Sequence, residues 1–147
     1  MTKIELKYGP RVFSCSLCDA RILQSEVLPE PPDAEGLIRK ALAHPIGTAS
    51  LGEILTPGEK VAVVTSDITR YSGSEVFLPI LVEELNALGI ADADIEIIIA
   101  LGIHRKQTEE EHRKIVGSLY GRVAVYDHEC EDPAELIDLG FTDSGIP

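Results

Sequence analysis

Runs of β-branched and other apolar residues, each followed directly by polar side chains, dominate the pattern along this chain. Residues 61–64 and 95–99 are two such runs, and the polar stretches at 65–70 and 100–105 follow them. Continuous apolar runs of this length are typical of parallel strands that are buried on both faces. Between them, apolar residues at spacings of three and four over 76–88 predict a helix that packs one side on a sheet.

The order strand, helix, strand predicts a right-handed crossover that leaves the two strands parallel. Thr108 and Glu111 have the spacing of a capping box, so a second helix is expected to follow Thr108 and to end at Gly117. His112, beside three glutamates in that helix, is expected on its solvated face. A third apolar run follows at 123–126. We therefore predict an α/β fold with a Rossmann-like layered parallel sheet flanked by helices.

The first part of the chain has a different pattern. Residues 4–8 and 12–17 alternate in character around a glycine and a proline, which predicts a half-buried N-terminal β-hairpin. A loop with three prolines at 24–32 precedes Asp33, which is well placed as the N-cap of a helix over 34–43. We predict a single α/β domain or domain fragment with three parts, namely the hairpin at 1–20, a linker and helix at 21–58, and the α/β core at 59–147.

Composition and charge narrow the classes of partner. The chain has 147 residues, about one domain, and a formal net charge of -12 from 13 Lys and Arg against 25 Asp and Glu. That balance opposes any binding of nucleic acid through a basic face. No apolar stretch approaches the roughly 20 residues that span a bilayer, and the first residues lack the apolar core of a secretion signal. We expect a cytoplasmic protein with no nucleic acid and no membrane as partner.

Cysteine usage and glycine motifs are less informative. Cys15 and Cys18 form a C-x-x-C pair, which fits a redox or metal site. No second pair and no nearby histidine accompany them, so we favour two reduced thiols in or beside a strand. No glycine-rich phosphate motif follows any strand, which argues against a dinucleotide or P-loop site. An anion could still bind at residues 72–74, where the first helix after the polar stretch begins.

The polar strand ends supply the candidate chemistry. Ligands of α/β sheets bind beyond the carboxyl ends of the strands, so Asp67 and Arg70 are expected on the same rim as His104. Arg70 suits a carboxylate because its donor fork matches two oxygens, although a local ion pair with Asp67 is the alternative. His104 suits acid-base work, although it could be a surface histidine near a helix start. His128 is either a rim residue or a metal ligand, with no second ligand at metal-binding spacing.

Several motifs, in order, resemble one family. They are Ser-Asp-Ile-Thr-Arg at 66–70, the helix with Leu-Pro-Ile-Leu at 78–81, Ala-Leu-Gly-Ile-His-Arg at 100–105 with Thr108 and Glu111, Gly117, Asp-His at 127–128, and the stretch 139–145. From about residue 51 to its last residue, the chain is similar to the opening part of the nickel-dependent lactate racemase family. Tyr71 and Ile103 depart from that family, which usually has proline and threonine there.

This resemblance implies an enzyme that racemises or epimerises 2-hydroxy acids by hydride transfer to a nickel pincer nucleotide. It implies that His104 is an acid-base histidine and that Arg70 clamps the substrate carboxylate. Contacts to substrate or cofactor are implied for Ser66, Asp67, Thr69 and Arg105.

The resemblance also implies that this chain is only the N-terminal portion of the enzyme. The second histidine, the lysine that tethers the cofactor and the nickel-binding histidine come later in the family's chain. The isolated chain is therefore expected to be inactive, without a metal or cofactor of its own, and to act with a small 2-hydroxy acid and the downstream part of the same enzyme. The alternative is a stand-alone small-anion binding or regulatory domain without catalysis, and the length of the reading frame separates the two.

Overall fold

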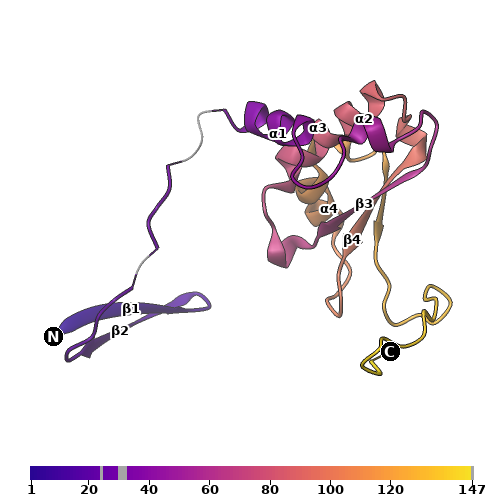
Figure 1. Ribbon diagram of the computed structural model, residues 1–147. Helices are drawn as coiled ribbons and strands as arrows, with labels where there is room; N and C mark the ends of the chain where they lie inside the picture. Colours follow the sequence, from indigo (N-terminus) through magenta and orange to yellow (C-terminus); the bar gives the residue numbers. More distant parts are fainter. Residues whose placement is uncertain (24, 30–32, 147) are drawn as a thin grey trace. The chain divides into compact units, whose positions relative to one another are not determined.

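The computed structural model describes residues 1–23, 25–29 and 33–146, so four residues of the predicted proline-rich loop, 24 and 30–32, lie outside it. The chain divides into two compact units, residues 1–32 and 33–147. Figure 1 shows the hairpin of the first unit and the helices and sheet of the second. No helix among the described residues is long and apolar enough to cross a membrane.

The first unit is the predicted hairpin. Strand β1 (Thr2–Tyr8) pairs antiparallel with β2 (Arg11–Leu17), and Gly9 makes the turn with a φ of +56°. The expected half burial is wrong, because β2 is exposed along its whole length and only Thr2 and Ile4 of β1 are partly buried. Two strands alone have no second layer to cover their apolar side chains.

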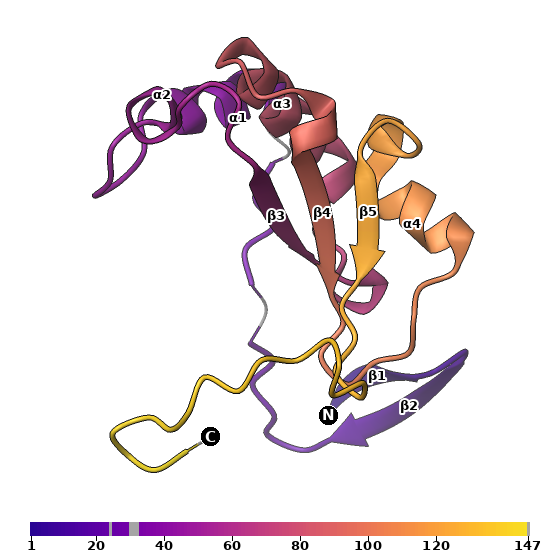
Figure 2. The same ribbon diagram turned by 90° about the vertical axis from the view of Figure 1, so that its right-hand side faces the viewer.

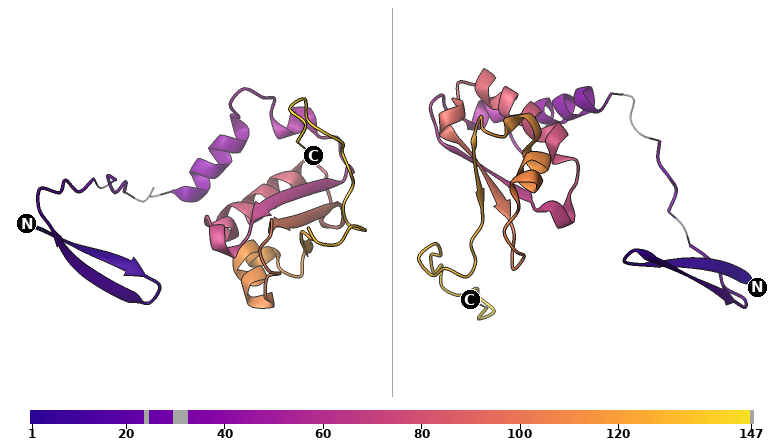
Figure 3. Two further views of the ribbon diagram at one scale, coloured as in Figure 1. Left: turned by 90° about the horizontal axis from the view of Figure 1, so that it is seen from below. Right: turned by 180° about the vertical axis from the view of Figure 1, so that it is seen from behind.

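The second unit contains the predicted parallel sheet, which confirms the α/β fold. Its strands are β3 (Val61–Ser66), β4 (Ile95–Ala100) and β5 (Ala124–Asp127), in the order β3-β4-β5. Ser66 pairs with Ala100, and Ile99 pairs with Asp127, so all three strands end at nearly the same level. The loops after β3 and β4 therefore emerge together, at the lower end of the sheet in Figure 1, and the segment after β5 leaves from the same end in Figure 3.

Two helices cover one face of this sheet. Helices α3 (Ser74–Ala87) and α4 (Glu109–Val116) pack on it, and Figure 2 shows α4 beside β5. They form one core with the strands, whose most buried members include Leu78, Val82, Leu85, Ile95, Ile97, Ile99, Ile115 and Val116. The predicted capping box is present, since the Thr108 side chain accepts from the Glu111 N–H and the Glu111 side chain accepts from the Thr108 N–H.

The other face of the sheet is open. Side chains that alternate with the core are exposed, namely Ala62, Val64, Glu96, Ala100, Ala124 and Tyr126. Val64 is 66% exposed and Tyr126 is 54% exposed. The expectation of strands buried on both faces is therefore wrong for the described residues. Apolar runs of this kind are typical of a sheet that is covered on both faces. Among the described residues, only the face that packs on α3 and α4 is covered.

Two shorter elements pack beside α3. Helix α1 (Ala34–Ala43) has the predicted cap, since Asp33 Oδ1 accepts from the Gly36 N–H at 2.8 Å. Arg39 of α1 donates to Glu83 at 2.6 Å and to Glu84 at 2.8 Å, which ties α1 to α3. Helix α2 (Leu51–Ile54) is one turn that leads into β3.

Candidate active site

Asp67 and His104 lie in direct contact at the carboxyl ends of β3 and β4. The imidazole Nδ1 of His104 donates to Oδ2 of Asp67, because an ionised carboxylate can only accept. The side chain of Asp67 is 2% exposed and that of His104 is 42% exposed. None of the described residues hydrogen-bonds Nε2 of His104. The pair thus combines a buried carboxylate with an imidazole whose second nitrogen is open to a ligand.

The local sequence holds Asp67 in this position. Asp67 is the N-cap of a 3₁₀ turn over Ile68–Arg70, and its Oδ1 accepts from the N–H of Thr69 at 2.9 Å and from Oγ1 of Thr69 at 2.6 Å. Burial raises the pKa of the Asp67 carboxyl, but the hydrogen bonds from Thr69 and His104 outweigh burial and lower that pKa to about 2. Asp67 is therefore ionised at neutral pH.

Arg70 stands at the end of the same turn. The hydroxyl of Ser66 donates to its backbone oxygen at 3.1 Å, which closes the turn. The alternative of a local Asp67–Arg70 ion pair is wrong, because Asp67 uses its oxygens for Thr69 and His104. Arg70 is exposed, and its guanidinium bonds no residue in 1–23, 25–29 or 33–146. It is thus available to an anion.

Arg105 is held differently. Its two terminal nitrogens donate to the two carboxylate oxygens of Glu111 at 2.8 Å each. Arg105 lowers the pKa of the Glu111 carboxyl to about 2, and the Thr108 N–H contributes. This bidentate pair joins the loop after β4 to the first turn of α4, so the guanidinium fork of Arg105 is already occupied. Its predicted contact with substrate or cofactor stays a prediction.

A hollow of about 360 Å³ adjoins His104. The loop after β4 and the segment after β5 line it, with Leu101, Ile103, His104, Arg105, Lys106, His128, Glu129, Cys130 and Glu131. Its volume lies in the range of small-ligand pockets, about 300–1,000 Å³. Two of these residues, Lys106 and Glu129, form an ion pair at 2.9 Å.

Metal ligands do not gather in this hollow. His128 lies on its wall, but nowhere in the part of the chain that the structure describes do three or more His, Cys, Asp or Glu side chains form a group that could hold a metal ion. The described residues thus do not fit a nickel site. Cys15 and Cys18 are free and exposed.

Sequence reasoning missed a second histidine–carboxylate pair beside the first. The prediction of a solvated His112 is wrong, because its Nε2 donates to Oδ1 of Asp127 at 2.8 Å. Asp127 also accepts from the Gln107 N–H at 2.8 Å. One signal could have found this pair: Asp127 comes directly after the third apolar run, at the same rim as Asp67.

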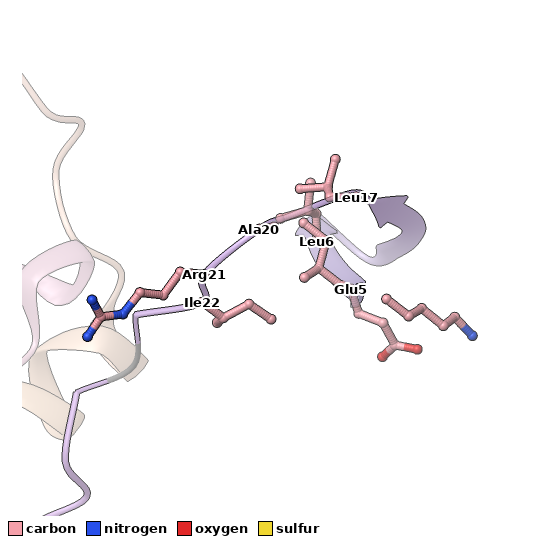
Figure 4. Close-up of a pocket in the computed structure, with 8 residues that line it drawn as sticks. Glu5, Leu6, Leu17, Ala20, Arg21 and Ile22 are labelled. Carbon is pink, nitrogen blue, oxygen red and sulfur yellow. The ribbon is translucent and has the colours of Figure 1, made fainter. Parts of the chain in front are cut away.

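The hairpin unit has a hollow of its own, of about 460 Å³. Figure 4 shows it between the strands and the segment that follows them, with Leu6 and Leu17 on its wall and Arg21 directed away from them. Its other lining residues are Lys3, Ile4, Glu5, Ala20 and Ile22. A lone Glu5 without a histidine or hydroxyl beside it offers no acid-base pair, so the rim of the sheet is the better candidate.

Comparisons with known proteins agree on one family. The family described as "Lactate racemase N-terminal domain" matches residues 8–147. The lactate racemase of Lactiplantibacillus plantarum is 26% identical over 151 residues, which cover 99% of this chain and 35% of that protein. The lactate racemase of Thermoanaerobacterium thermosaccharolyticum is 32% identical over 122 residues, which cover 80% of this chain and 28% of that protein.

A solved structure gives the same result. The lactate racemase apoprotein from Thermoanaerobacterium thermosaccharolyticum superposes with a TM-score of 0.74 at 28% sequence identity, over 99% of this chain and 34% of that one. The chain therefore spans about a third of the length of the relatives that it matches.

Proposed function

The chain belongs to the lactate racemase N-terminal domain family, and from that premise we propose that it is the N-terminal portion of an isomerase that racemises or epimerises 2-hydroxy acids. The observation that carries the proposal is the Asp67–His104 pair beside a hollow of about 360 Å³, with Arg70, whose guanidinium bonds no described residue, on the turn that Asp67 caps. A 2-hydroxy acid presents a hydroxyl proton and a carboxylate, which a base and an arginine recognise.

His104 is the proposed acid-base group. Its Nε2 accepts the hydroxyl proton of the substrate and later returns it. Asp67, bonded to Nδ1, fixes the ring orientation and stabilises the imidazolium that forms. A positioned base of this kind contributes about 10²–10⁴-fold in rate.

Arg70 is the proposed carboxylate clamp. A guanidinium binds both oxygens of a carboxylate at once, so it fixes the substrate's orientation as well as its charge. Ser66 and Thr69 support this role through the turn, since Ser66 closes it and Thr69 bonds Asp67. Both side chains are also proposed to reach the substrate or cofactor, and so is Arg105.

Hydride acceptance from the carbon that carries the hydroxyl is the chemistry that a nickel pincer nucleotide supplies when bound. The described residues include no metal-ligand cluster, so we propose that its anchor and its nickel ligands come from a downstream part of the same enzyme. The residues of this chain act on the hydroxyl proton and the carboxylate.

Kinetics of the enzyme expressed from its complete reading frame test the proposal. His104→Ala should lower kcat far more than it raises KM for a panel of 2-hydroxy acids. His44→Ala is the matched control, since His44 follows α1 and its ring hydrogen-bonds, among the described residues, the backbone oxygen of Lys40 alone. Near-normal turnover of the His104 variant would assign the acid-base role elsewhere, with His128 the next residue to replace.

The second candidate function is a small-anion binding or regulatory domain without catalysis. The Arg70 guanidinium, which is unpaired among the described residues, favours it, because an anion site needs Arg70 and not His104. A reading frame about three times the length of this chain, as in the relatives, favours the enzyme. A stop codon after Pro147 favours the binding domain.

A further inference from the structure

The loop that carries His104 has little buried surface. Among residues 102–108 only Gln107 is partly buried, and the other six are exposed. Exposed loops with little buried surface open at low free energy. The position of His104 relative to Asp67 therefore depends on individual hydrogen bonds that tie this loop to the sheet.

Gln107 ties the loop in two directions. Its Oε1 accepts from the N–H of Ile68, the residue that directly follows Asp67, at 3.1 Å. Its backbone N–H donates to Oδ2 of Asp127 at 2.8 Å. Its Nε2 donates to the backbone oxygen of Arg105 at 3.3 Å, which fits an amide oxygen that points toward Ile68. One residue thus joins the polar ends of β3, β4 and β5.

Asp127 is the fixed end of this connection. Its side chain is 8% exposed, and both oxygens are used, one by Gln107 and the other by Nε2 of His112 at 2.8 Å. Asp127 pairs with Ile99 in the register of the sheet, so its backbone cannot shift without breaking the β4–β5 ladder. The Asp127 carboxylate thus uses both oxygens inside the fold. The Asp67–His104 pair differs, because no described residue bonds Nε2 of His104.

We propose that Gln107 and Asp127 are positioning residues of the acid-base site. They hold the loop so that His104 meets both Asp67 and the substrate. The expected effect on kcat rests on the proposed function, whereas the expected effect on the position of the His104 ring does not. A displacement of about 1 Å at a reacting group can lower a rate about 10²-fold, so loss of the tie should appear in kcat.

Nuclear magnetic resonance of the histidine rings tests the structural part on this chain without any substrate. Long-range ¹H–¹⁵N spectra report which ring nitrogen of His104 carries the proton. Gln107→Ala and Asp127→Ala should average or lose the Nδ1–H signal of an imidazole bonded to a carboxylate. Asp127→Asn should keep it, because the amide oxygen still accepts from the Gln107 N–H and the amide nitrogen donates to Nε2 of His112 when that ring carries its proton on Nδ1.

Asn86→Ala is the matched control. Asn86 is also a part-buried amide that bridges a loop, and it donates to the Ile90 oxygen and to Asp92 at 2.9 Å each. Its bonds lie at the amino ends of the strands, so its loss should lower stability while leaving the His104 signals unchanged. His104 signals unchanged in Gln107→Ala and Asp127→Ala overturn the positioning role, and so do signals that change equally in Asn86→Ala.

Kinetics of the complete enzyme then separate the two proposals. Gln107→Ala should lower kcat about 10-fold to 100-fold with KM within about twofold, and Asp127→Asn should retain most of the wild-type kcat. Altered His104 signals in the Gln107→Ala chain, together with a complete wild-type enzyme that lacks racemase activity, would refute the proposed function and leave the positioning role intact. Unaltered kcat in Gln107→Ala, in an enzyme that is active, would refute the positioning role alone.

Discussion

Replacement of Asp67 by asparagine tests the electrostatics of the site in the fold itself. The variant keeps the size of the side chain and removes the charge that Thr69 and His104 bond. The pKa of the Asp67 carboxyl falls from its ordinary 3.8 to about 2 in the folded chain. Folding therefore favours the ionised form, and this preference contributes to stability.

The sign of the effect follows from linkage. A carboxyl group with a lowered pKa in the folded state stabilises the fold fully above its unfolded pKa, and the contribution is lost as the pH falls from about 4 to about 2. The full difference corresponds to about 2 kcal/mol. Because His104 is 42% exposed, screening by water reduces this to about 1 kcal/mol.

Urea unfolding followed by circular dichroism, at several values between pH 6 and pH 2, measures this contribution. The free energy of unfolding of Asp67→Asn should fall below that of the wild type by about 1 kcal/mol more at pH 6 than at pH 2. Asp94→Asn removes one negative charge from a side chain without a hydrogen-bond partner among the described residues, and it serves as the control. A difference that stays constant with pH, or that grows in acid, refutes the reasoning.

Three further predictions concern the clamp, a backbone site and metal binding. Arg70→Ala should raise KM and lower kcat of the complete enzyme, and Arg70→Lys should restore little, because an ammonium cannot bind two oxygens in the plane of a guanidinium; steady-state kinetics decide this. Gly117→Ala should lower the free energy of unfolding by about 1 kcal/mol or more, because Gly117 has a φ of +57° and an added Cβ would lie 3.0 Å from the backbone oxygen of Glu75. Gly121→Ala is the steric control, because a Cβ added at this exposed glycine meets no atom within 4 Å. The purified chain should hold no stoichiometric nickel by elemental analysis, and near-stoichiometric nickel would direct attention to Cys15, Cys18 or His128.

Local signals in the sequence were sufficient for the secondary structure of the second unit. The apolar runs form β3, β4 and β5. Helix α4 begins after the capping box at Thr108 and ends at Gly117. These features depend on neighbours within a few residues, so one sequence reveals them. The meeting of Asp67 with His104 also followed, because parallel adjacent strands end at one rim.

Contacts that depend on the direction of a side chain could not be predicted from the sequence. Three glutamates beside His112 indicated a solvated face, but the turn of α4 directs His112 toward Asp127, 15 positions away. Gln107 gave no signal, because a glutamine in a loop is ordinarily exposed. The burial of the hairpin and of the second sheet face depends on what else packs there, which periodicity does not report.

The two histidine–carboxylate pairs at this rim have different chemical capacities. In His112 and Asp127 the carboxylate uses both oxygens within the fold, and that pair holds structure. In His104 and Asp67 no described residue bonds the imidazole Nε2, so one proton acceptor remains on a residue that lines the hollow. Racemisation needs a proton acceptor for each enantiomer, since the hydroxyl lies on opposite sides of the reacting carbon. In the proposed reaction His104 serves one enantiomer, and the acceptor for the other is expected from the downstream part of the enzyme.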